Sequence, residues 1–118
     1  MKTRLLVVDD DPAVRRVIKR MLEGAEREIL EAANGAEALR LVSERHPDLV
    51  LLDIHMPRMG GIAALSAIAR AHPEVAVIMV SGDDDLALAR SAMEQGACDY
   101  LTKPVDARSL HMSVSAYL

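Results

Sequence analysis

The sequence lacks several residue types and segments that would indicate common classes of protein. Its 118 residues include no tryptophan, no phenylalanine, two tyrosines and one cysteine, Cys98, which cannot form an internal disulfide and fits a reducing compartment. No apolar run approaches the roughly 20 residues of a membrane-spanning helix, and the first apolar run is too short for a signal peptide. We therefore expect a cytoplasmic protein that does not enter a membrane and has an aliphatic core.

Positive charge is neither abundant nor clustered. The 14 Lys and Arg residues stand against 18 Asp and Glu residues, which gives a formal net charge of -4. Binding to a nucleic-acid backbone requires clustered cations, so we expect this domain to bind no nucleic acid. A glycine-rich phosphate loop is also missing after the first apolar segment, where three acids stand instead. Nucleotide binding of the dinucleotide or flavin type is therefore disfavoured.

Apolar segments alternate with segments of helical periodicity along the chain. Continuous apolar runs at residues 5–8, 49–52 and 75–80 are typical of strands buried on both faces of a parallel sheet, and residues 28–33 and 99–102 are weaker candidates that suit the edges. The segments between them favour helices, the last from about residue 107 to the end. This pattern predicts one doubly wound (βα)5 domain over residues 1–118, a flavodoxin-like α/β fold with a five-stranded parallel sheet of order 2-1-3-4-5. We expect no output domain in this chain.

Polar side chains follow four of the predicted strands, at the edge where open α/β sheets bind ligands. In chain order they are Asp9, Asp10, Asp11, Asp53, Ser81 and Lys103. Asp11 precedes Pro12 and has a structural explanation as a helix cap. The other acids would repel each other at a buried strand end, and they persist most easily with a bound cation. Oxygen ligands without clustered Cys or His favour Mg²⁺ or Mn²⁺, and the alternative is a group of solvated turn acids.

Lys103 and Ser81 would suit an anion beside such a metal. A cation, a hydroxyl donor and a metal ion together form a site for a phosphoryl group. The carboxylate of Asp53 is an adequate nucleophile, and the product would be an aspartyl phosphate. The alternatives are an ordinary surface lysine and a helix-start hydroxyl.

Four motifs in this order resemble the receiver domain of two-component response regulators. They are LLVVDDD at residues 5–11, LLDIHMP at residues 51–57 with Gly60 following, VSG at residues 80–82 and GACDYLTKP at residues 96–104. The resemblance spans nearly the whole chain. It implies a phosphoprotein that accepts a phosphoryl group on Asp53 from a histidine kinase or a histidine phosphotransfer protein. It also implies that the domain catalyses only its own phosphorylation and dephosphorylation, and is not otherwise an enzyme.

The resemblance further implies a set of metal ligands. Asp10 and Asp53 would bind Mg²⁺ (or Mn²⁺) directly, and the backbone carbonyl of His55 would be a third ligand. Asp9 would act through a water molecule.

Roles in the phosphorylated state follow from the same resemblance. Lys103 would contact the phosphoryl oxygens, and its bond to Pro104 would be a cis peptide. Ser81 and Tyr100 would be the switch residues: Ser81 would hydrogen-bond to the phosphate, and Tyr100 would rotate inward. The face formed by the fourth helix, the fifth strand and the fifth helix would then control an output domain or a downstream protein, and a homodimer through this face is a further implication.

Three other functions remain open. A phosphohydrolase with an aspartyl nucleophile usually carries a second acid two residues later, where this chain has His55. A flavin or nucleotide carrier of similar fold is disfavoured by the acidic first turn. A receiver that is not phosphorylated is disfavoured because the acids, the serine and the lysine are all present. We also hypothesise that His55 and Asp83 flank the site and tune hydrolysis of the acyl phosphate.

Overall fold

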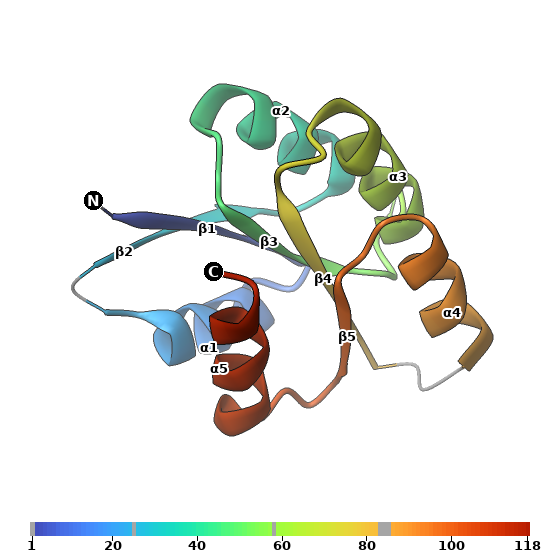
Figure 1. Ribbon diagram of the computed structural model, residues 1–118. Coiled ribbons are helices and arrows are strands. Elements are labelled where there is room, and N and C mark those ends of the chain that lie inside the picture. The colour runs from blue at the N-terminus through green and yellow to red at the C-terminus, as the bar shows by residue number, and fades with distance from the viewer. Residues whose placement is uncertain (1, 25, 58, 83–85) are drawn as a thin grey trace.

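Five parallel strands form a single sheet in the order β2-β1-β3-β4-β5 (Figure 1). The computed structural model describes residues 2–24, 26–57, 59–82 and 86–118. The elements, in chain order, are β1 (Thr3–Val8), α1 (Pro12–Leu22), β2 (Arg27–Ala32), α2 (Gly35–Arg45), β3 (Leu49–Asp53), α3 (Gly61–Ala71), β4 (Ala76–Ser81), α4 (Leu86–Glu94), β5 (Asp99–Thr102) and α5 (Ala107–Ala116). The predicted α/β class, the parallel sheet and the strand order are confirmed.

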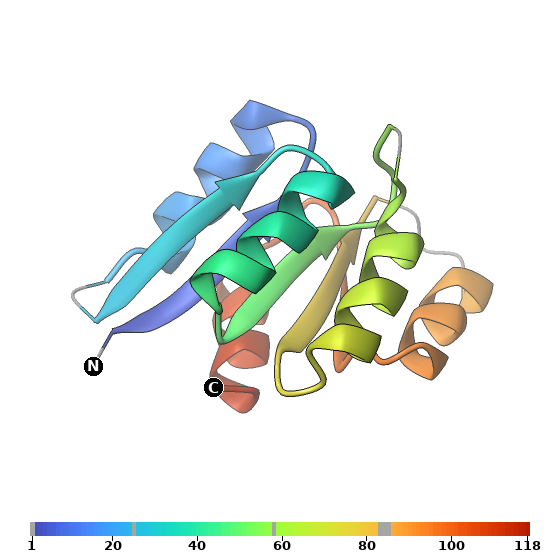
Figure 2. The ribbon, with the colours of Figure 1, turned by 90° about the horizontal axis from the view of Figure 1, so that it is seen from above.

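Helices cover both faces of the sheet, α1 and α5 on one face and α2, α3 and α4 on the other (Figure 2). Successive residues of a strand point to opposite faces, so each central strand contributes to two apolar clusters. Leu6 and Leu52 pack on the side of α2, α3 and α4, whereas Leu5 and Leu51 pack on the side of α1 and α5. Burial on both faces explains the unbroken apolar runs of β1, β3 and β4, while the weaker segments β2 and β5 lie at the edges, as predicted.

Side-chain caps set the starts of three helices. Asp11 accepts a hydrogen bond from the backbone N–H of Ala13, and Pro12 occupies the first position of α1. Asn34 caps α2, and Asp106 caps α5. Such caps satisfy backbone donors that have no partner inside the helix. The structural interpretation of Asp11 is therefore confirmed.

Two strands are displaced by one residue from the predicted ranges. Strand β2 covers residues 27–32 where residues 28–33 were expected, and β4 covers residues 76–81 where residues 75–80 were expected. The ladders show the same bounds: Thr3 aligns with Arg27 at the start of β2, and Ser81 aligns with Thr102 at the end of β4. Ser81 is consequently the last residue of a strand.

None of the described helices is both long and apolar enough to cross a bilayer.

Candidate phosphorylation and metal site

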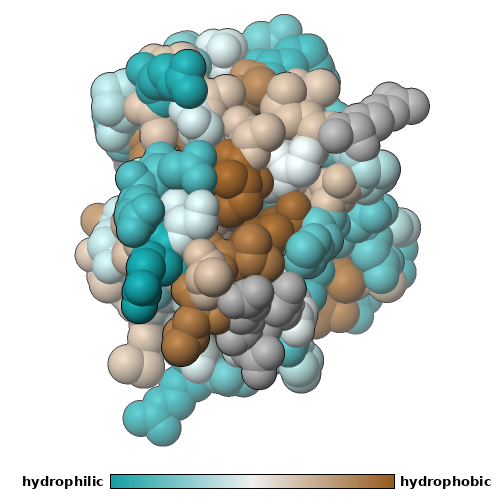
Figure 3. Space-filling model, turned by 90° about the vertical axis from the view of Figure 1, so that its right-hand side faces the viewer, coloured by the Kyte–Doolittle hydropathy of each residue, from teal (hydrophilic) through white to brown (hydrophobic). Residues whose placement is uncertain are grey.

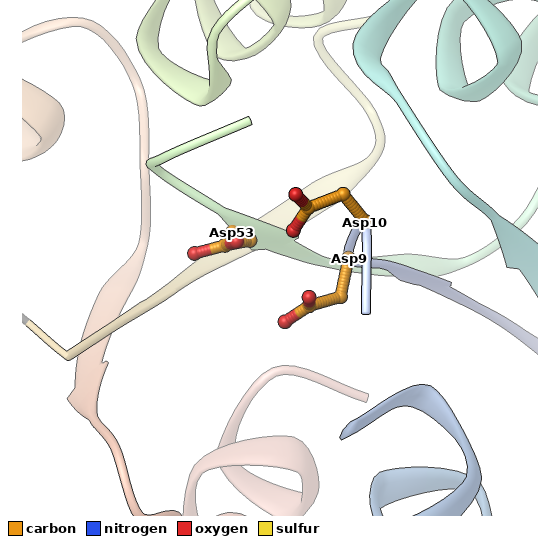
Figure 4. A group of neighbouring side chains, drawn as sticks. All are labelled: Asp9, Asp10 and Asp53. Atoms are coloured by element: carbon orange, nitrogen blue, oxygen red, sulfur yellow. The ribbon is translucent and has the colours of Figure 1, made fainter. Parts of the chain in front are cut away.

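Three carboxylates converge where β1 and β3 end side by side (Figure 4). Asp9 and Asp10 directly follow β1, and Asp53 is the last residue of β3. Each offers one oxygen atom, and these atoms all lie within 4.8 Å of one another. Asp9 and Asp53 are only 2% and 4% exposed, whereas Asp10 faces solvent. A group of hard oxygen ligands that is open to solvent on one side fits Mg²⁺ or Mn²⁺ and could hold either ion.

Lys103 places one positive charge against two of these carboxylates. Its Nζ atom lies 2.7 Å from Oδ2 of Asp9 and 3.5 Å from Oδ1 of Asp53. The residue follows β5, and its backbone N–H donates to the carbonyl of Ser81 at 2.8 Å. This bond ties Lys103 to the end of β4, the strand that lies between β3 and β5. The peptide bond from Lys103 to Pro104 is cis.

Protonation of the site follows from burial and from the excess of negative charge. Burial raises the pKa of the Asp53 carboxyl above its ordinary value of 3.8, and the charge of Asp9 raises it further. Lys103 and a backbone hydrogen bond from His55 oppose this effect without cancelling it. Burial alone would lower the pKa of Lys103, but its hydrogen bond to Asp9 and the charge of Asp53 outweigh burial and raise that pKa. Lys103 therefore stays protonated, and the site keeps a surplus of negative charge that favours a cation.

The remaining predicted residues lie beside this group or further along the sheet. Ser81 is fully buried at the end of β4, one residue beyond Val80, which pairs with Asp53. His55 is exposed and follows Asp53 by two residues. Tyr100 lies on the edge strand β5, half-buried against the apolar cluster on the side of α2, α3 and α4, so it does not join the carboxylate group. The hypothesis on Asp83 lies outside the described residues.

One residue that holds the site was missed at the level of sequence. Arg15, on the second turn of α1, donates a hydrogen bond from Nη1 to the backbone carbonyl of Asp9 at 2.7 Å. An arginine on an amphipathic helix gives no sequence signal for such a contact, because its partner is a main-chain atom.

Known proteins agree with this geometry. The sequence model of one protein family, the response regulator receiver domain, matches residues 5–115 of this chain. This chain belongs to that family. The DNA-binding transcriptional regulator NtrC of Escherichia coli K12 is 46% identical over 100 residues, which cover 85% of this chain and 21% of NtrC. The transcriptional regulatory protein SrrA of Staphylococcus aureus is 36% identical over 118 residues, which cover all of this chain and 48% of SrrA.

Solved receiver structures superimpose on nearly the whole chain. A CheY-like receiver domain from Methanospirillum hungatei JF-1 gives a TM-score of 0.93 at 32% identity, with 98% of this chain and 93% of that chain covered. The receiver domain of NtrX from Brucella abortus gives a TM-score of 0.91 at 35% identity, with 97% of each chain covered. The chain is therefore a receiver domain of the kind found in two-component systems, which signal through phosphorylation. It spans between about a fifth and a half of the length of these curated relatives.

Proposed function

We propose that this receiver domain accepts a phosphoryl group on Asp53 and changes its surface in response. The observation that carries the proposal is the placement of Lys103 between Asp9 and Asp53, at the edge of a group of three carboxylates. A nucleophilic carboxylate with an adjacent cation and a candidate metal site has the parts that phosphoryl transfer requires.

The transfer begins with attack of a carboxylate oxygen of Asp53 on the phosphorus of a phosphohistidine. The new oxygen–phosphorus bond forms as the phosphorus–nitrogen bond of the donor breaks. The leaving imidazole keeps the electron pair and takes up a proton. Lys103, whose Nζ atom lies 3.5 Å from Oδ1 of Asp53, would move from its pairing with Asp9 to the phosphoryl oxygens.

The same residues would hold the metal ion. A bound Mg²⁺ would neutralise part of the negative charge that builds up on the phosphoryl oxygens during transfer. Asp10, Asp53 and the backbone carbonyl of His55 are the proposed direct ligands. Asp9 is the proposed indirect ligand, because its carboxylate already accepts hydrogen bonds from Lys103 and from the backbone N–H of Asp11.

Phosphorylation would then be reported by Ser81 and Tyr100. The buried hydroxyl of Ser81 at the end of β4 would hydrogen-bond to the phosphoryl group, and Tyr100 on the neighbouring strand would turn inward. A new charge that gains hydrogen bonds in only one arrangement biases a two-state element toward that arrangement. The domain would catalyse its own phosphorylation and dephosphorylation and act on no other substrate.

The proposed output surface is the face formed by α4, β5 and α5. Apolar side chains gather between hydrophilic flanks on the side of the molecule that carries α4 (Figure 3). Leu86 and Met93 on α4 are 78% and 46% exposed, and Met112 on α5 is 65% exposed. Exposed apolar groups of this size on a receiver suit contact with another protein surface. The proposed partners are an output domain, a downstream protein or a second copy of the domain.

The phosphoryl donor would be a histidine kinase or a histidine phosphotransfer protein. The proposal includes a cytoplasmic location, which the free, half-buried Cys98 fits.

Intact mass after incubation with Mg²⁺ and acetyl phosphate tests the central step. We expect one phosphoryl adduct on the wild type and none on Asp53→Asn. Asp11→Asn is the matched control: it removes a neighbouring acid, but asparagine caps a helix as well as aspartate does, so the adduct should remain. Absence of an adduct on the wild type, or its persistence on Asp53→Asn, would contradict the proposal.

A further inference from the structure

We propose that Arg15 and Glu31 form a positioning pair that sets the geometry of the metal site through the backbone of Asp9. The inference rests on the proposed function, since it concerns how Asp10 is held in place for the cation. Neither residue offers a ligand atom to the metal. Their effect would be on the direction in which the chain leaves β1.

The Asp9–Asp10 peptide is the critical unit. The carbonyl of Asp9 belongs to the same planar peptide as the N–H of Asp10, so fixing that oxygen restricts the orientation of the Asp10 backbone. Arg15 donates from Nη1 to this oxygen at 2.7 Å. On the other side of the residue, the N–H of Asp9 donates to the carbonyl of Ala32 in β2 at 3.2 Å. The main chain of Asp9 is thus held on both sides.

Arg15 is itself anchored. Its Nε atom lies 3.1 Å from Oε1 of Glu31, and Lys19 approaches the other oxygen of Glu31 at 3.7 Å. Glu31 lies on β2, directly beside Val7 of β1. The side chain of Arg15 is only 17% exposed. A guanidinium that donates in two fixed directions from a half-enclosed position suits this bridging role better than a flexible ammonium would.

Asp10 needs such support. Among the residues that the structure describes, no hydrogen bond or ion pair to the Asp10 side chain is found, and the residue faces solvent. Its place near Asp9 and Asp53 therefore depends on its backbone. Groups that orient metal ligands usually contribute about 10- to 100-fold to metal affinity.

Loss of the positioning contact and loss of the positive charge of Arg15 should change metal affinity in opposite directions, which makes the inference testable. Removing a cation near a carboxylate group should strengthen binding of Mg²⁺ or Mn²⁺ if only long-range electrostatics matters. We expect Arg15→Met to weaken Mn²⁺ binding about tenfold, at the low end of the range for supporting groups, because Arg15 acts one peptide away from the ligand. Arg16→Met is the matched control. It removes the same charge from an exposed neighbour on α1 and should leave the affinity unchanged or slightly higher.

The experiment is a Mn²⁺ titration of the unphosphorylated protein, followed by electron paramagnetic resonance of the free ion, with Mg²⁺ as competitor. In the phosphorylation assay with acetyl phosphate, the Mg²⁺ concentration for half-maximal rate should rise by the same factor in Arg15→Met, while the rate at saturating Mg²⁺ stays near that of the wild type. A purely structural role would instead lower thermal stability and leave the affinity of the folded protein unchanged.

Glu31→Gln provides a second variant should Arg15→Met fold poorly. We expect it to weaken Mn²⁺ binding more than Glu28→Gln does, which removes the same charge from the far end of β2. The double variant Arg15→Met/Glu31→Gln should bind no more weakly than Arg15→Met alone, because Glu31 acts through Arg15. Unchanged or tighter binding in Arg15→Met, or equal effects of the two Glu variants, would overturn the inference. Failure of the wild type to bind Mn²⁺ or to form an adduct would instead overturn the proposed function.

Discussion

Replacing Asp53 by asparagine should stabilise the protein in the absence of metal. At oxygen separations of at most 4.8 Å, the carboxylates of Asp9 and Asp10 would each repel the charge of Asp53 by at least about 3.5 kcal/mol at an effective dielectric constant of about 20. The ammonium of Lys103, 3.5 Å away, would attract the Asp53 carboxylate by about 4.7 kcal/mol at the same dielectric constant. Before screening, a net repulsion of at least about 2 kcal/mol remains, and solvent around the exposed Asp10 reduces it.

We therefore expect Asp53→Asn to raise the free energy of unfolding by about 1 to 2 kcal/mol at neutral pH. Asparagine has nearly the same shape and can still accept hydrogen bonds from Lys103 and from the backbone of His55. The measurement is urea unfolding in a chelator, followed by far-ultraviolet circular dichroism, because the chain has no tryptophan.

Magnesium should narrow the difference in stability between the wild type and Asp53→Asn. A ligand that binds only the folded state at ten times its Kd adds about 1.4 kcal/mol to the free energy of unfolding. The wild type should gain this amount and the variant much less, so that the difference between them narrows. A variant less stable than the wild type in chelator, or equal stabilisation of both by Mg²⁺, would refute the account of Asp53 as a metal ligand that its neighbours repel when no metal is bound.

Three further outcomes follow from contacts around the site and in the last helix. Folding raises the pKa of Asp53 above 3.8, so the free energy of unfolding of the wild type in chelator should fall as pH rises from about 3.8 through the pKa of the folded state. Urea unfolding of Asp53→Asn over the same pH range should lack this fall. Gly61→Ala should lower the free energy of unfolding in urea by about 3 kcal/mol, because a Cβ there would lie 2.0 Å from the backbone oxygen of Asp53. Gly24→Ala should be nearly neutral, because a Cβ there would meet no atom of the other described residues within 4 Å, its chain neighbours aside. Ser113→Ala should cost about 1.5 kcal/mol and increase hydrogen exchange in α5, because the buried Ser113 hydroxyl donates to the carboxylate of Asp99; unchanged exchange would contradict this reasoning.

The sequence by itself determined the class of fold and the edge at which the site forms. Unbroken apolar runs such as residues 49–52 occur where both faces of a strand are covered, so they predicted a parallel sheet with helices on each side. Parallel strands all end at the same edge, and the acids after the first and third strands were therefore expected to meet there. The capping role of Asp11 was equally local, since a cap depends on residues two or three positions away.

Only the tertiary structure decided which groups touch. Asp9 and Asp10 are adjacent in sequence, yet one is buried and paired with Lys103, 94 residues away, while the other faces solvent. The contact of Arg15 with a main-chain oxygen leaves no mark on the pattern of residue types. These facts depend on the direction in which the chain leaves each strand and on the register between strands, and both are fixed by packing of the whole sheet and not by any local preference.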